Sequence, residues 1–236
     1  MNTGYYENLS ENFNQAVQLL QEDYSHEQLI ELLKTGNIVQ KQFGALRLTT
    51  VKSVDDATVL ISNLTGQDGK IREVVSLRLK EFLADNKIVD YFKQEKFYPI
   101  FLDAIIDING NICRNIISAI LNLKTDENFC KIFCSKLVVL TNNLLDKIEH
   151  VDFREGKYKV NKEVFKLYWC LETICYFYDK ISLVDLKGIL LRAKNIEEYT
   201  IREKVAKILT NKIDDEELKN AKTELRNDKN YYVRRF

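Results

Sequence analysis

The chain has 236 residues, of which 45% are hydrophobic and 30% are charged. This hydrophobic content is enough to form a folded core and is higher than that of disordered chains. Lys plus Arg and Asp plus Glu each number 35, so the formal net charge is zero, which disfavours a protein that wraps duplex nucleic acid through overall positive charge. One proline and eight glycines are few for this length, which predicts helices joined by short turns and an all-α fold.

The first predicted helix covers about residues 10–21. Phe13, Val17 and Leu20 recur there at helical spacing and form an apolar stripe. We expect the segment 1–24 to act as an N-terminal capping helix, because it lacks the phrase that recurs along the rest of the chain.

After this segment, helices are predicted in pairs, each opened by a polar residue and closed by a turn. Ser25 and Gln28 form a capping box that opens the first pair, whose first helix ends at Gly36 and whose second covers about residues 38–52. Similar polar and glycine-containing signals mark later openings and turns, at Ser53–Asp56, Gly66–Gly69, Asn109–Asn111, Thr125–Asn128, Ser182–Asp185 and Asp214–Glu217.

A short phrase recurs where the second helix of a predicted pair begins. It reads IREVVS at Ile71–Ser76, CRNIIS at Cys113–Ser118 and IREKVA at Ile201–Ala206, and it starts again at Val233. With looser versions at Val39 and Val160, the successive anchors are 32, 42, 47, 41 and 32 residues apart, which brackets the period of helical-pair repeats. The last phrase stops after half a repeat, which we expect to be a natural end of the chain.

The turn followed by Ile/Val-Arg resembles the HEAT-repeat family, most clearly at Arg72 and Arg114, whereas Gln40 and Asn161 stand where arginine is expected. The resemblance covers residues 25–236 and implies one armadillo-like solenoid domain, a right-handed α-α superhelix of about five to six helical pairs. It also implies that the second helices line a concave binding surface, and that arginine at the repeated position ties one repeat to the next through a neighbouring aspartate.

One predicted pair is irregular: its first helix continues to about Ile148, and a charged loop over 149–159 precedes a second helix from about Asn161 to Tyr178. This second helix is rich in aromatic residues, and a single core-facing stripe cannot bury them all. Tyrosine and tryptophan often dominate binding interfaces, although bulky filler of the core is a competing interpretation. The expected partner-binding residues are Tyr168, Trp169, Tyr176, Lys162, Lys166 and Arg202.

The sequence lacks the common catalytic and metal-binding patterns. There is no glycine-rich phosphate loop and no metalloprotease histidine pair, and His26 and His150 are expected to be solvated. Cys130 and Cys134 could supply half of a zinc site, but the five cysteines fit free buried thiols in a reducing compartment better. With neither a secretory signal nor a membrane-spanning stretch in this sequence, we expect a cytoplasmic protein with no catalytic residues, metal or cofactor.

The leading hypothesis is a non-enzymatic scaffold or adaptor that binds a protein or peptide partner on the concave face. A nucleic-acid partner is the less favoured alternative. It is suggested by a similarity in outline to the HEAT-like alkylpurine DNA glycosylases. Residues 201–236 contain ten Lys/Arg against seven Asp/Glu, a small local excess of positive charge. A third hypothesis is an enzyme of the HEAT-like bilin-lyase type, which would require a bound cofactor or one of the cysteines.

Overall fold

The computed structural model describes the backbone of residues 3–149 and 157–236, and the side chains of residues 11–149 and 162–236. The structure is 75% helical with no strand in the described ranges, and its thirteen α-helices pack against their neighbours. The prediction of an all-α fold is therefore confirmed. No described helix combines the length and the apolar character that crossing a bilayer requires.

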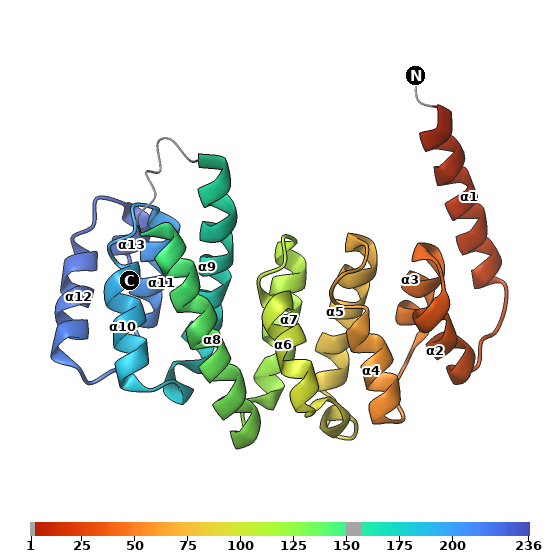
Figure 1. The fold of residues 1–236 in the computed structure, drawn as a ribbon, viewed down its shortest axis with the longest axis horizontal. Helices are drawn as coiled ribbons and strands as arrows, with labels where there is room; N and C mark the ends of the chain where they lie inside the picture. The colour runs from red at the N-terminus through yellow and green to blue at the C-terminus, as the bar shows by residue number, and fades with distance from the viewer. Residues whose placement is uncertain (1–2, 150–156) are drawn as a thin grey trace. The chain divides into compact units, whose positions relative to one another are not determined.

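The chain divides into two compact units, each considered by itself (Figure 1). Unit 1 comprises residues 1–104 and 109–123, and unit 2 comprises 105–108 and 124–236. The helices of unit 1 are α1 (Thr3–Leu20), α2 (His26–Thr35), α3 (Ile38–Arg47), α4 (Val54–Ser62), α5 (Gly69–Leu83), most of α6 (Tyr98–Ile105) and α7 (Gly110–Ile120). Those of unit 2 are α8 (Glu127–Ile148), α9 (Lys157–Phe177), α10 (Leu183–Ala193), α11 (Tyr199–Ile208), α12 (Glu216–Arg226) and α13 (Tyr231–Arg234).

Polar caps open the helices where the sequence predicts them. The capping box of Ser25 and Gln28 is present at α2, and a second one, Asn37 with Gln40, opens α3. These side chains satisfy backbone N–H groups that have no partner inside the helix. Side-chain oxygens cap later helices in the same way, at Ser53, Asp68, Asn109, Asp126, Ser182 and Asp215.

Several helix ends differ from the expected positions. The first helix begins at Thr3, earlier than expected, and α3 ends at Arg47, short of Lys52. The backbone N–H of Lys52 instead donates to the Asp56 carboxylate (2.8 Å), which fixes an extended connection into α4. Two short 3₁₀ turns, Val89–Phe92 and Glu95–Phe97, precede α6.

In each unit, helices that carry the recurring phrase pack side by side. In unit 1, α3 packs on α5 and α5 on α7, while α2 packs on α3 and α1 also contacts α3 (Figure 1). In unit 2, α9 packs on α11 and α11 on α13, while α8 packs on α9 and α10 contacts both α8 and α11. The rings of Phe129, Phe133 and Phe177 meet between α8 and α9, with centroids 5.0 to 6.3 Å apart.

The turn before α5 depends on a glycine. Gly66 has φ of 69°, a left-handed conformation that costs an L-residue about 1 kcal/mol or more. We therefore expect Gly66→Ala to lower the free energy of unfolding by about 1 kcal/mol, measured by urea denaturation. Gly69→Ala, three residues later in open space at the start of α5, is the matched control and should be neutral or slightly stabilising. Equal losses in both variants would contradict this interpretation of the turn.

Candidate partner-binding surface

Most of the residues expected to bind a partner lie on α9, where they differ greatly in exposure. Lys162 is exposed, Lys166 and Tyr168 are half-buried, and Tyr176 is 39% exposed. Trp169, in contrast, is only 6% exposed. The expectation that Trp169 contacts a partner therefore needs correction, because its side chain is buried in this structure.

The burial of Trp169 has a simple packing explanation. The ring of Tyr168 packs edge-on against it, with centroids 5.2 Å apart and an interplanar angle of 87°. Phe165 makes a similar contact at 6.1 Å. Edge-to-face packing of this kind adds to the stability that the buried area itself provides. At Trp169, the competing interpretation of aromatic filler is the one that fits.

Tyr168 and Tyr176 flank an ionic cluster that joins α9 to α11. Glu172 of α9 accepts hydrogen bonds from the Nζ atoms of Lys204 (2.7 Å) and Lys207 (3.0 Å) of α11. The Lys204 ammonium lies 4.3 Å from the ring centroid of Tyr168, and that of Lys207 lies 5.6 Å from the ring centroid of Tyr176. One carboxylate therefore holds two cations, each of which also contacts a tyrosine.

The electrostatics of this cluster keep both partners charged. Burial by itself raises the pKa of Glu172, but the hydrogen bonds and charges of Lys204 and Lys207 outweigh it, and the pKa lies below its ordinary value of 4.5. Burial likewise lowers the pKa of Lys204, but Glu172 and Tyr168 outweigh it, and the net shift is upward. A carboxylate and an ammonium that hold their charges this firmly are poorly suited to exchange protons near neutral pH. The cluster therefore works as a tie between two helices.

Arg202 is also committed to a tie between helices, and only 8% of the residue is exposed. Its Nε and Nη2 atoms donate to the two carboxylate oxygens of Asp228, at 2.7 and 3.2 Å, and Nη1 donates to the carbonyl oxygens of Ile196 and Glu197. At this position the predicted arginine–aspartate tie is confirmed. The expectation that Arg202 binds a partner is corrected accordingly, since the side chain is buried and its donors are used within the chain.

Arginines at the same position of the recurring phrase make related contacts in other helices. Arg72 donates to the carbonyl of Gln67, and Arg234 donates to the carbonyls of Asp228 (3.2 Å) and Lys229 (2.9 Å). In each case the guanidinium folds back onto the turn that precedes its own helix. The recurring arginine therefore has a local role in stabilising the turn between paired helices.

Exposed aromatic side chains gather elsewhere, at the start of α11 and on α13. Tyr199, Tyr231 and Tyr232 are 38%, 62% and 51% exposed. The Tyr199 and Tyr232 rings are 6.1 Å apart, the Tyr231 and Tyr232 rings 5.8 Å apart, and guanidinium groups of Arg234 and Arg235 lie over the last two rings. We call these five residues the α11–α13 surface.

The α11–α13 surface was not predicted, because the recurring phrase marks residues 231–236 only as the start of an incomplete repeat. The signal was present in the order of the residues. Val233 occupies the repeated anchor position and is fully buried, so the adjacent Tyr231 and Tyr232 cannot share its orientation on a short helix. Two exposed neighbouring tyrosines follow from that placement.

A groove lies at the opposite end of α11. It has a volume of about 530 Å³ and runs along the connection from α11 to α12. Lys212, Lys219 and Lys222 line it together with the apolar side chains of Leu209 and Leu218. Lys219 is already paired with Asp214 at 2.8 Å.

The histidine and cysteine predictions have mixed outcomes. His26 is not solvated: its side chain is 14% exposed, and Nε2 lies 2.8 Å from Oδ2 of Asp56, which ties α2 to α4. His150, and the 150–156 part of the predicted charged loop, lie outside the described residues. All five cysteines are free and only Cys175 is partly exposed, while burial raises the pKa of Cys134 to about 12. Among the described side chains, no group of His, Cys, Asp and Glu is arranged to hold a metal ion.

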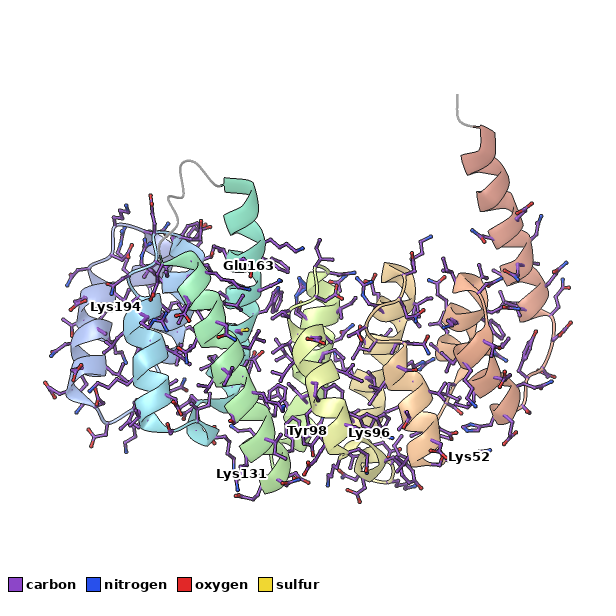
Figure 2. The ribbon with its side chains drawn as sticks, viewed as in Figure 1. Lys52, Lys96, Tyr98, Lys131, Glu163 and Lys194 are labelled. Carbon is purple, nitrogen blue, oxygen red and sulfur yellow. The ribbon has the colours of Figure 1, made fainter. Side chains whose placement is uncertain are left out.

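Figure 2 labels Glu163 on α9. Glu163 lies within one turn of Lys166, whose Nζ is 3.3 Å from its carboxylate, and both side chains are about one-quarter exposed. Among the side chains of α9 that the structure describes, Lys162 and Tyr176 are the more open ones.

Comparisons with known proteins give little beyond this. No family model matches the chain. No curated protein matches it either. Among solved structures, it is similar to the crystal structure of an engineered protein from the Northeast Structural Genomics Consortium, with 13% sequence identity and a TM-score of 0.42 over 79% of this chain and 78% of that chain.

Proposed function

We propose that this chain is a non-enzymatic binding module, a scaffold or adaptor that holds a protein partner on the α11–α13 surface. The observation that carries the proposal is the exposure of three tyrosines within ring-contact distance of one another, two of them under arginine side chains. Clustered tyrosine and arginine side chains dominate the energy of many protein interfaces, because they bring large rigid areas with polar ends. Lys162 and Tyr176 remain exposed on α9, and Tyr176 contacts Lys207 near the other end of α11, so we assign neither to this interface.

The architecture we propose is a HEAT-like α-solenoid of helical pairs. Two features support it: the phrase that recurs at the starts of α5, α7 and α11, and the side-by-side packing of phrase-bearing helices in each unit. The tie from Arg202 to Asp228 is also what the HEAT resemblance implies for its repeated arginine. In such repeat proteins, neighbouring second helices form an extended binding surface, which suits a partner rather than a small substrate.

The non-enzymatic assignment rests on how the ionisable residues are used. The charged side chains of two ion pairs, Arg202–Asp228 and Lys204–Glu172, are at most 14% exposed, and each is engaged by fixed partners inside the chain. The cysteine thiols whose pKa is shifted by burial are all shifted upward, away from the reactive thiolate form. Free thiols also suit a reducing compartment, so we place the protein in the cytoplasm.

A double variant, Tyr231→Ala/Tyr232→Ala, tests the proposal. The partner is first captured from native lysate with the unaltered chain, identified by mass spectrometry and purified, and its affinity is measured by calorimetry. We expect the variant to bind about tenfold more weakly or worse, because each exposed hot-spot tyrosine typically contributes about 1–2 kcal/mol.

The matched control is Leu183→Ala/Val184→Ala, which removes two exposed side chains (46% and 81%) at the start of α10. Circular dichroism should show that both variants keep their helix content. A partner that binds the tyrosine variant and the control equally well would rule out the α11–α13 surface as its site. A partner that proves to be nucleic acid would favour the alternative hypothesis.

A further inference from the structure

Carboxylates in residues 201–236 are fully used in ion pairs. All seven Asp and Glu side chains of this segment lie within 4 Å of a Lys or Arg nitrogen. Three of these pairs use lysines from outside the segment: Lys187 of α10 holds Asp215 and Glu217, and Lys194, the residue after α10, holds Glu224. The remaining acidic residues are held within the segment itself: Glu203, Asp214, Glu216 and Asp228.

Cations in the same segment are in surplus. Five of its ten Lys and Arg residues take part in those or other ion pairs, and the other five have no carboxylate partner among the described residues. Lys187 and Lys219 each hold two carboxylates, so not every pair is balanced one to one. Ten Lys and Arg against seven Asp and Glu still leave this segment positively charged in a chain whose total charge is zero. The five unpaired cations are Lys212, Lys222, Arg226, Lys229 and Arg234.

Two of these cations adjoin the exposed tyrosines. Arg234 has its guanidinium 5.8 Å from the ring centroid of Tyr231, and Lys229 is exposed in the turn directly before α13. A guanidinium stacked on a ring keeps its planar edge available for a carboxylate. Arg235 illustrates this arrangement, because it lies over Tyr232 while its Nη2 donates to Glu203 at 2.6 Å.

We propose that the partner of the α11–α13 surface is an acidic protein segment. This inference rests on the proposed function and specifies the chemistry of the partner. Aspartate or glutamate side chains of the segment pair with Arg234 and Lys229, and its apolar side chains pack on Tyr231 and Tyr232. The intramolecular contact of Glu203 with Arg235 is the pattern that a partner carboxylate repeats at Arg234.

The ring contacts favour a protein over a single-stranded nucleic acid. Bases bind such surfaces by stacking on open aromatic faces. The Tyr232 ring centroid is 5.3 Å from the Arg235 guanidinium and 6.1 Å from the Tyr199 ring, and Arg234 lies over Tyr231, so a guanidinium already covers part of each ring on which a base would stack. A carboxylate requires only one edge of a guanidinium group, and at Arg234 the bonds to the preceding turn use Nη1 and leave Nε and Nη2 for it.

Defined probes test the inference by fluorescence anisotropy. The probes are a fluorescein-labelled peptide of alternating glutamate and leucine, the same peptide with lysine in place of glutamate, and an oligothymidylate of equal length. We expect the glutamate peptide to bind. The double variant Lys229→Gln/Arg234→Gln should lower its affinity by about tenfold, because charge-assisted contacts are lost. Raising the salt concentration should also weaken binding.

The matched control is Lys212→Gln/Lys222→Gln, which removes the same charge from the groove at the other end of α11, about 15 Å along the helix. We expect this control to weaken peptide binding by less than about twofold, because only long-range electrostatic attraction, which salt screens, is lost. Because Arg234 also bonds the turn before α13, Lys229→Glu is included as a variant whose exposed side chain forms no such bond. The Lys229→Glu variant should also bind the glutamate peptide more weakly.

Equal losses in the groove control, or equal binding of the lysine peptide, would overturn the inference. Tighter binding of the oligothymidylate than of the glutamate peptide would replace it with a nucleic-acid partner. If the purified partner is lost from Tyr231→Ala/Tyr232→Ala but unaffected by Lys229→Glu, the proposed function stands and the acidic partner is wrong. If neither change affects the partner, both proposals fail.

Discussion

Replacing Asp228 with alanine is expected to lower the free energy of unfolding of unit 2 by about 3 kcal/mol, the cost of breaking a buried ion pair by removing one member. Asp228 and Arg202 have side chains that are only 10% and 9% exposed, and two hydrogen bonds join them. Without Asp228, the Arg202 guanidinium stays buried with carbonyl partners only. An exposed ion pair would contribute much less.

Urea denaturation followed by the fluorescence of Trp169, the single tryptophan, measures this loss in unit 2. Arg226→Ala is the matched control, because it removes an exposed charge from the end of α12 and should change stability by less than about 0.5 kcal/mol. The double variant Arg202→Leu/Asp228→Leu should recover part of the loss, since neither charge then remains buried alone. A loss below about 1 kcal/mol for Asp228→Ala would show that the pair is not a stabilising tie.

The pH dependence of the same pair has a defined sign. The hydrogen bond from Arg202 lowers the pKa of Asp228 below its ordinary value of 3.8. The stabilisation is therefore fully present above pH 3.8 and is lost as the pH falls through the lowered pKa. The difference between the unaltered chain and Asp228→Ala should shrink in acid and stay constant near neutrality.

Much of the fold was predictable because its signals are local. The capping boxes at Ser25 and Asn37 bind backbone groups three residues away, so residue order alone is enough to place them. The apolar spacing that follows each cap is equally local. Helix ends were less predictable. The helix α3 ends before Lys52, and the backbone N–H of Lys52 donates to the side chain of Asp56 in the next helix.

The candidate site was less predictable, because exposure depends on residues distant in sequence. Trp169 belongs to the aromatic helix that the sequence singled out, but the rings around it determine that it is buried. His26 was predicted to be solvated, but the fold places Asp56, 30 positions later in the sequence, with its Oδ2 atom 2.8 Å from Nε2 of His26. Tyr199 and Tyr232 form one surface only because α13 packs on α11.

Replacing Glu172 with glutamine tests the second buried tie. Lys204 has a side chain that is 9% exposed, and in the variant it loses the one carboxylate that pairs with it among the described residues. We expect a loss of about 2–3 kcal/mol in the free energy of unfolding, because a buried ammonium without a counter-charge is costly. The retained amide oxygen can still accept one hydrogen bond, which keeps the expected loss below that of Asp228→Ala.

Glu163→Gln on the same helix is the matched control, because the Glu163–Lys166 pair is more exposed and should contribute less than about 1 kcal/mol. The pKa of Glu172 lies below 4.5, so the stabilisation is present above that pH and disappears as the pH falls through the lowered value. The difference between the unaltered chain and Glu172→Gln should therefore be largest near neutrality and shrink in acid. A difference that persists unchanged to low pH would mean that the side chain acts by packing, and that charge does not hold α9 against α11.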